Sequence, residues 1–138
     1  MLVPDARLHL TLHFIGSFPL EGIDALAERL AAVPPRRMVL RANGAEMWRG
    51  GLAVLRIAPE PGLLGLHEDL SAVLSKLVVP IDTRPFAPHV TLARKAAGAQ
   101  PPGTASHLDW NAEGFALVES ITGTNVAYRV LRSFPPEG

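Results

Sequence analysis

Two short histidine-containing segments carry the side chains best suited to chemistry in this 138-residue chain: residues 9–12 read HLTL and residues 89–92 read HVTL. Each lies in an alternation of apolar and polar residues that is typical of a β-strand, where residues two apart share a face. His9 and Thr11 are therefore expected to project together, as are His89 and Thr91. Two imidazoles, each beside a hydroxyl, can supply a base, an acid and two hydrogen-bond donors to a phosphate group.

The chain has three further histidines and two tryptophans. His13 shares the predicted face of His9, so it either extends the same site or ends the strand in solvent, and the second interpretation is favoured. His67, on a predicted helix, and His107, after a predicted loop, are expected at the surface. Trp48 either stacks on a nucleobase or packs at the core or rim, and packing is favoured. A zinc site formed by His9, His13 and His89 is the alternative to acid–base chemistry, but neither segment contains a carboxylate, so we predict no metal.

The spacing of apolar residues predicts two helices, 21–33 and 63–78, and about eight short strands. The strands are expected at 7–15, 38–42, 45–48, 52–57, 89–94, 108–111, 115–120 and 127–134, with a weaker segment at 81–84 and a loop at 96–104. Strands in pairs separated by single helices predict an α+β fold with antiparallel sheets. No linker divides the chain, so residues 1–138 are expected to form one domain. The recurrence of His-x-Thr after eighty residues predicts a pseudo-twofold arrangement.

The composition limits the classes of molecule that this chain is expected to bind. Lysine plus arginine and aspartate plus glutamate both number 13, so the formal net charge is zero. This argues against a binder of long DNA duplex, which usually has a basic surface, and leaves a small nucleotide or an RNA end. The absence of cysteine excludes disulfides and thiolate catalysis. No apolar stretch is long enough to span a bilayer and no signal peptide is visible, so a cytoplasmic protein without a membrane partner is expected.

The two histidine segments, in their wider context of residues 8–16 and 84–94, resemble the signature segments of the 2H phosphoesterase superfamily. Within it they are most similar to the bacterial and archaeal RNA 2′,3′-cyclic phosphodiesterases, also called 2′–5′ RNA ligases. Residues 48–51 and 115–120, followed by Tyr128, resemble later segments of that family less specifically. The resemblance implies a bilobal fold with two antiparallel sheets facing a central groove and helices outside. Each sheet would present one His-x-Thr to a cyclic phosphate.

The same resemblance implies roles for individual residues. His89 would act as the general base that activates water, and His9 as the general acid that protonates the leaving ribose oxygen. Thr11 and Thr91 would hydrogen-bond the phosphate oxygens. Arg94 matches an arginine that the family places near the substrate phosphate; strict alternation would turn it to the core face, and a β-bulge could re-aim it. The expected reaction opens a terminal 2′,3′-cyclic phosphate on RNA to a 2′-phosphate without metal or cofactor, with 2′–5′ ligation as a secondary activity.

The chain departs from the family before the first motif. Relatives usually begin with a strand and a long helix, whereas only eight residues precede His9. A mis-set start, a naturally short variant and replacement of the missing element by a partner chain all explain this, and an open sheet edge would favour self-association. Two alternative functions remain: a phosphodiesterase acting on small cyclic nucleotides or 2′–5′ oligonucleotides, and a non-catalytic module that binds nucleotides or RNA ends.

Overall fold

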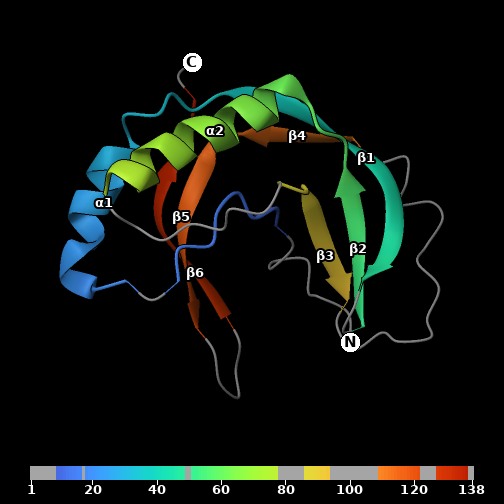
Figure 1. Ribbon diagram of the computed structural model, residues 1–138, viewed down its shortest axis with the longest axis horizontal. Coiled ribbons are helices and arrows are strands. Elements are labelled where there is room, and N and C mark those ends of the chain that lie inside the picture. Colours follow the sequence, from blue (N-terminus) through green and yellow to red (C-terminus); the bar gives the residue numbers. More distant parts are fainter. Residues whose placement is uncertain are drawn as a thin grey trace. The chain divides into compact units, whose positions relative to one another are not determined.

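The computed structural model describes residues 9–16, 18–48, 51–77, 86–93, 109–121 and 127–136. The contacts of the chain divide it into two compact units. Unit 1 comprises Met1–Leu12, Val39–Glu60 and Arg84–Asn111, and unit 2 comprises His13–Met38, Pro61–Thr83 and Ala112–Gly138. The described elements form an α+β fold with two antiparallel sheets (Figure 1), which confirms the predicted fold class. The single-domain assignment stays a prediction.

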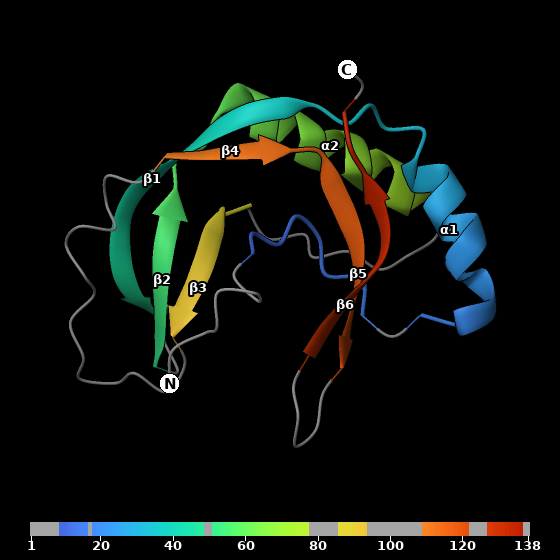
Figure 2. The same ribbon diagram turned by 180° about the vertical axis from the view of Figure 1, so that it is seen from behind.

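The larger sheet has four strands, and most of its residues belong to unit 1. Its strand order is β3-β2-β1-β4, and Figure 2 shows β1, β2 and β3 side by side. The strands are β1 (Arg37–Trp48), β2 (Leu52–Ile57), β3 (His89–Ala93) and β4 (Asp109–Glu113). β2 is antiparallel to both β1 and β3. Its Val54 is fully buried, and Leu55 and Ile57 are nearly so.

β1 is one long strand where the sequence predicts two, at 38–42 and 45–48. The pairing of β1 with β2 shifts between Ala42 and Ala45, so that three steps along β1 match two along β2, from Ile57 to Leu55. Gly44 lies in this interval with a φ of +105°, a left-handed conformation that glycine adopts without a steric penalty. The bulge therefore interrupts the alternation of side chains without ending the strand, which is why the pattern resembles two strands.

Unit 2 contains two helices and a hairpin. A short 3-10 turn (Leu20–Gly22) leads into α1 (Ile23–Leu30), and α2 spans Pro61–Lys76. The predicted helix at 21–33 ends earlier than expected, because residues 31–33 form a turn before Pro34. α2 begins two residues earlier than predicted, with a proline at the first helical position, where its missing N–H has no cost. Its leucines at i, i+3 and i+4 spacing, Leu63, Leu66, Leu70 and Leu74, are all buried.

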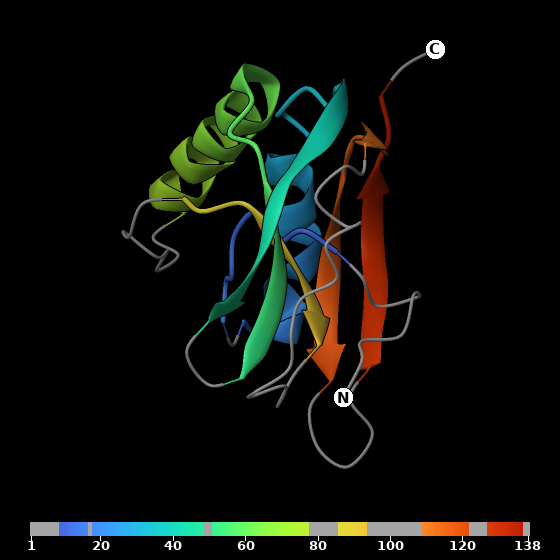
Figure 3. The same cartoon turned by 90° about the vertical axis from the view of Figure 1, so that its right-hand side faces the viewer.

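The hairpin of unit 2 consists of β5 (Phe115–Ile121) and β6 (Ala127–Phe134), visible as the orange and red arrows in Figures 2 and 3. The two strands are antiparallel, and Phe115 pairs with Phe134. Their rings stack with centroids 4.7 Å apart. Both strands were predicted from their alternation. The weak strand predicted at 81–84 and the loop at 96–104 lie outside the described residues.

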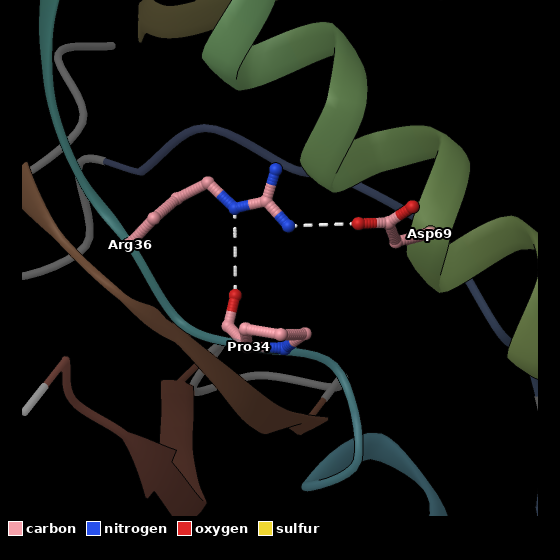
Figure 4. Close-up of polar contacts among 3 residues, drawn as sticks. All are labelled: Pro34, Arg36 and Asp69. Carbon is pink, nitrogen blue, oxygen red and sulfur yellow. Dashed lines mark hydrogen bonds and ion pairs between the residues drawn. The ribbon is translucent and has the colours of Figure 1, made fainter.

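Arg36 ties the segment after α1 to α2 (Figure 4). Its Nη2 donates to Oδ2 of Asp69 at 2.7 Å, and its Nε donates to the carbonyl oxygen of Pro34 at 3.4 Å. Gly65, one helical turn before Asp69, leaves room for the guanidinium: a Cβ there would lie 3.2 Å from Nη1. A charge-assisted bond of this kind orients the chain as it enters β1.

Neither of the described helices is both long and apolar enough to cross a bilayer.

Truncation of a buried leucine in α2 tests the helix register. Leu66→Ala should lower the free energy of unfolding by about 2–5 kcal/mol, because Leu66 is only 2% exposed and its removal leaves a cavity. The matched control is Leu64→Ala on the same helix, where the side chain is 39% exposed and the loss should stay below about 0.5 kcal/mol. Urea denaturation of both variants measures the difference. Equal losses would contradict the register.

Candidate active site

The second histidine segment lies on β3, as predicted. His89 pairs with Arg56 of β2, Val90 with Leu55, and Thr91 with Val54. Because directly paired residues share a face, His89 and Thr91 project together, and Val90 projects to the opposite face. Val90 is 7% exposed, whereas His89 and Thr91 are half-buried. The β-branched pair Val90 and Thr91 favours this extended conformation.

The first histidine segment is not a strand, contrary to the prediction for residues 7–15. Within the described part, residues 9–16 form only one bridge, in which Leu10 pairs with Val90 in the antiparallel sense. Alternation of residue types predicts which side chains share a face, but it does not supply a continuous row of hydrogen-bond partners. His9 and Thr11 are exposed, as their predicted face requires. Leu10 and Leu12 are half-buried where core positions were expected.

The bridge brings the two segments together within unit 1. In an antiparallel pair centred on Leu10 and Val90, the residues that follow one partner approach those that precede the other. Leu10 and Val90 are the pair that the structure shows, and no further pair continues the bridge among the described residues. Paired Cα atoms are separated by roughly 4.5–5.5 Å in an antiparallel arrangement. The two histidine segments are thus neighbours at this one position.

The ring of His89 has a defined tautomer. Its Nδ1 lies 2.8 Å from the carbonyl oxygen of Ala87. A carbonyl oxygen only accepts hydrogen bonds, so Nδ1 carries the proton and donates it. In the neutral ring, Nε2 is then the nitrogen with a free lone pair. The indole of Trp48 lies against the same imidazole, with ring centroids 4.4 Å apart and an interplanar angle of 53°.

A charged pair shares the face of His89. Arg56, the cross-strand neighbour of His89, donates from Nη1 to Oε1 of Glu46 at 3.0 Å. Both side chains are 42% exposed, so the pair is partly screened by solvent. Sequence reasoning missed these two residues, because only the pairing of β2 with β3 places Arg56 beside the histidine.

A cavity of about 330 Å³ lies in unit 1, and His9 forms part of its lining. The others are Leu40, Leu55, Ile57, Val90, Asp109 and Trp110. Leu55 and Val90 project from the face of the sheet opposite His89, and His89 is not among the residues of this lining. The structure therefore joins the two segments at Leu10 and Val90, and it places His9 beside the apolar face.

His13 contacts α2, contrary to the expectation that it ends in solvent. It is half-buried, and its Nε2 lies 3.0 Å from both the carbonyl oxygen of His67 and Oγ of Ser71. Because a carbonyl oxygen only accepts hydrogen bonds, Nε2 of His13 carries a proton and donates it to the carbonyl oxygen of His67. The rings of His13 and His67 stack with centroids 4.1 Å apart. His67 is likewise half-buried and not the solvated residue that was predicted.

Two further candidate residues, Arg94 and His107, lie outside the described residues. The pairing of β2 with β3 shifts between Thr91 and Ala93, so β3 contains an irregularity before its last residue. Among the described residues, no group of three or more histidine, cysteine, aspartate or glutamate side chains is arranged to bind a metal ion.

Comparison with known proteins gives concordant matches. Residues 2–123 match the 2′-5′ RNA ligase superfamily. The chain is 38% identical to an RNA 2′,3′-cyclic phosphodiesterase of Thermus thermophilus, over 99% of this chain and 75% of that protein. It is 32% identical to a Geobacillus stearothermophilus protein of the same name, over 72% of this chain and 33% of the relative. The crystal structure of E. coli LigT complexed with 3′-AMP superposes with a TM-score of 0.85 and 25% identity, covering 99% of this chain and 81% of LigT.

The stacked histidines predict a pH-dependent stability. Burial, and secondarily the neighbouring His13 ring, lower the pKa of His67 from its usual 6.5. The unfolded chain therefore takes up this proton at a higher pH than the folded chain does. The stability that depends on neutral His67 is complete above pH 6.5 and is lost as the pH falls towards the lowered value.

Urea denaturation between about pH 7 and pH 5 should accordingly show a falling free energy of unfolding. His67→Gln should make this fall shallower, since the substituted side chain cannot titrate. A uniform loss of stability at every pH, with the slope unchanged, would mean that His67 contributes packing but no proton linkage.

Proposed function

Because the chain belongs to the 2′-5′ RNA ligase superfamily, we propose that it is an RNA 2′,3′-cyclic phosphodiesterase that opens the terminal cyclic phosphate to a 2′-phosphomonoester. The observation that carries the proposal is the 38% identity to the Thermus enzyme over 99% of this chain, with both His-x-Thr segments within the matched residues. The Leu10–Val90 bridge supports it, because it sets the two segments side by side.

In the proposed reaction, Nε2 of His89 accepts a proton from a water molecule as the water oxygen attacks phosphorus. The tautomer supports this role, since donation from Nδ1 to Ala87 leaves Nε2 as the acceptor. The bond between phosphorus and the ribose 3′-oxygen breaks, and His9 donates a proton to that oxygen. The 2′-oxygen keeps the phosphate. Atoms and charge balance without a metal ion, provided that His89 starts neutral and His9 starts protonated.

His9 lines the cavity on the apolar face, so its ring must reach the phosphate from there. The side chain is exposed, so a ligand in solvent can reach it. His9 lies near β3 in space, because the next residue, Leu10, pairs with Val90 of that strand. We infer that both imidazoles converge when a cyclic phosphate binds. Arg94 remains a predicted further phosphate contact.

The LigT crystal structure with 3′-AMP favours a second candidate substrate, a small nucleotide. In this version the same residues would act on a nucleoside 2′,3′-cyclic phosphate. Parallel assays with a cyclic-phosphate-terminated oligonucleotide and with the mononucleotide distinguish the two candidates by their kcat/KM. Ligation to a 2′–5′ linkage would be the same step with the 5′-hydroxyl of a second RNA end in place of water: that oxygen attacks phosphorus, the bond to the 3′-oxygen breaks, and the 2′-oxygen keeps the phosphate.

The first test is hydrolysis of a 2′,3′-cyclic-phosphate-terminated oligonucleotide with EDTA present, identifying the product by its phosphate position. His9→Ala and His89→Ala should each lower kcat by about 10²- to 10⁴-fold, because each removes one proton transfer. His67→Gln on α2 is the matched histidine control and should keep the wild-type rate. A 3′-phosphate product, or full activity in either alanine variant, would overturn the assignment.

The threonines are expected to stabilise charge on the phosphate oxygens. Thr11→Ala and Thr91→Ala should each lower kcat by roughly 10- to 1000-fold, since each removes one hydrogen-bond donor from the transition state. Thr11→Ser and Thr91→Ser keep the hydroxyl and should recover most of the rate. If serine recovers no more than alanine does, the methyl group is what matters, and the threonines are packing residues.

A further inference from the structure

Trp48 and His89 meet although they lie on strands that are not neighbours. Trp48 is the last residue of β1 and His89 is the first of β3, with β2 between them. Val54 of β2 pairs with Glu46 on one side and with Thr91 on the other. Since residues two apart share a face, Trp48 and His89 project from the same face as these three. Their ring centroids are 4.4 Å apart.

Two independent contacts restrict the imidazole of His89. The hydrogen bond from Nδ1 to the Ala87 carbonyl, 2.8 Å long, orients one edge of the ring. The indole of Trp48 lies against the ring at an interplanar angle of 53°. Both rings are half-buried. Nε2, on the edge away from Nδ1, remains available to a substrate or a water molecule.

The indole also matters for the charge that His89 would acquire. A cation that lies against the π-face of an indole is stabilised by the ring quadrupole. The charged groups that face His89 from the neighbouring strands are Arg56 of β2 and Glu46 of β1, and they neutralise each other at 3.0 Å. A carboxylate directly on the imidazole would hold it protonated, whereas an indole stabilises the cation and leaves the neutral base accessible.

We infer that Trp48 is a positioning residue for His89: it holds the imidazole so that Nε2 faces the substrate, and it stabilises the imidazolium during turnover. This inference rests on the proposed function for its catalytic part. The ring contact itself can be tested without any activity. The sequence contains only two tryptophans, so a Trp110→Phe background leaves Trp48 as the sole indole.

Tryptophan fluorescence in that background is the first test. An imidazole in contact with an indole changes the surroundings of that indole, so at one fixed pH the emission of Trp110→Phe/His89→Gln should differ in intensity or maximum from that of Trp110→Phe. Far-UV circular dichroism verifies that both proteins are folded. Identical emission spectra of the two folded proteins would overturn the ring contact.

Kinetics tests the positioning. Trp48→Leu should lower kcat by about 10- to 100-fold with KM changed less than about threefold, because a misplaced base impairs chemistry more than binding. Trp48→Phe keeps an aromatic face and should recover most of the loss. A wild-type kcat in Trp48→Leu, or a change confined to KM, would overturn the inference. A wild-type protein without turnover would instead contradict the proposed function, and the fluorescence result would still decide the contact.

Discussion

The arrangement of the candidate site depends on the pairing of Val90. This residue pairs with Leu55 on one side and with Leu10 on the other, and only 7% of its surface is exposed. The first pairing sets the register of β3 on β2, so it determines that His89 lies beside Arg56 and that Thr91 lies beside Val54. The second attaches a segment that has no strand of its own. Because side chains alternate with a period of two, a slip of one residue at Val90 would turn every polar side chain of β3 to the apolar face.

Local patterns were sufficient to predict part of this arrangement. The alternation at residues 89–92 predicted the strand and the shared face of His89 and Thr91, and the spacing of leucines predicted α2. The same reasoning failed at residues 7–15, since a strand needs a neighbour with a matching row of donors and acceptors, and only Leu10 finds one among the described residues. His13 and His67 were misplaced for a related reason. The two rings stack although the residues are 54 positions apart in the sequence, and the residues around each histidine do not indicate that the other will be its neighbour.

The contact of Trp48 with His89 shows a second reason why sequence analysis was incomplete. Both residues were named as candidates, but their contact depends on two strand registers at once, that of β1 on β2 and that of β2 on β3. The family resemblance assigned roles to the histidines and threonines, and it left the surroundings of the imidazole open. Arg56 and Glu46 are part of those surroundings and follow from the same registers. What distinguishes this site from a generic pair of His-x-Thr segments is thus encoded in strand pairing, not in any single motif.

The bulge in β1 has a further consequence for evolution of this chain. Before it, Leu40 and Ala42 point to the face of Ile57; after it, Ala45 takes up that face, and the even-numbered Glu46 and Trp48 point the other way. One surplus residue thus inverts the parity of the strand between its two halves. A single-codon deletion within residues 43–44 would remove the surplus residue and leave the indole on its present face, whereas deletion of Met47 would place Trp48 opposite Ala53 and turn the indole to the side of Leu40, away from the imidazole. In the half of the strand after the bulge, the number of residues therefore matters as much as their identity, and substitutions would be tolerated more readily there than insertions or deletions.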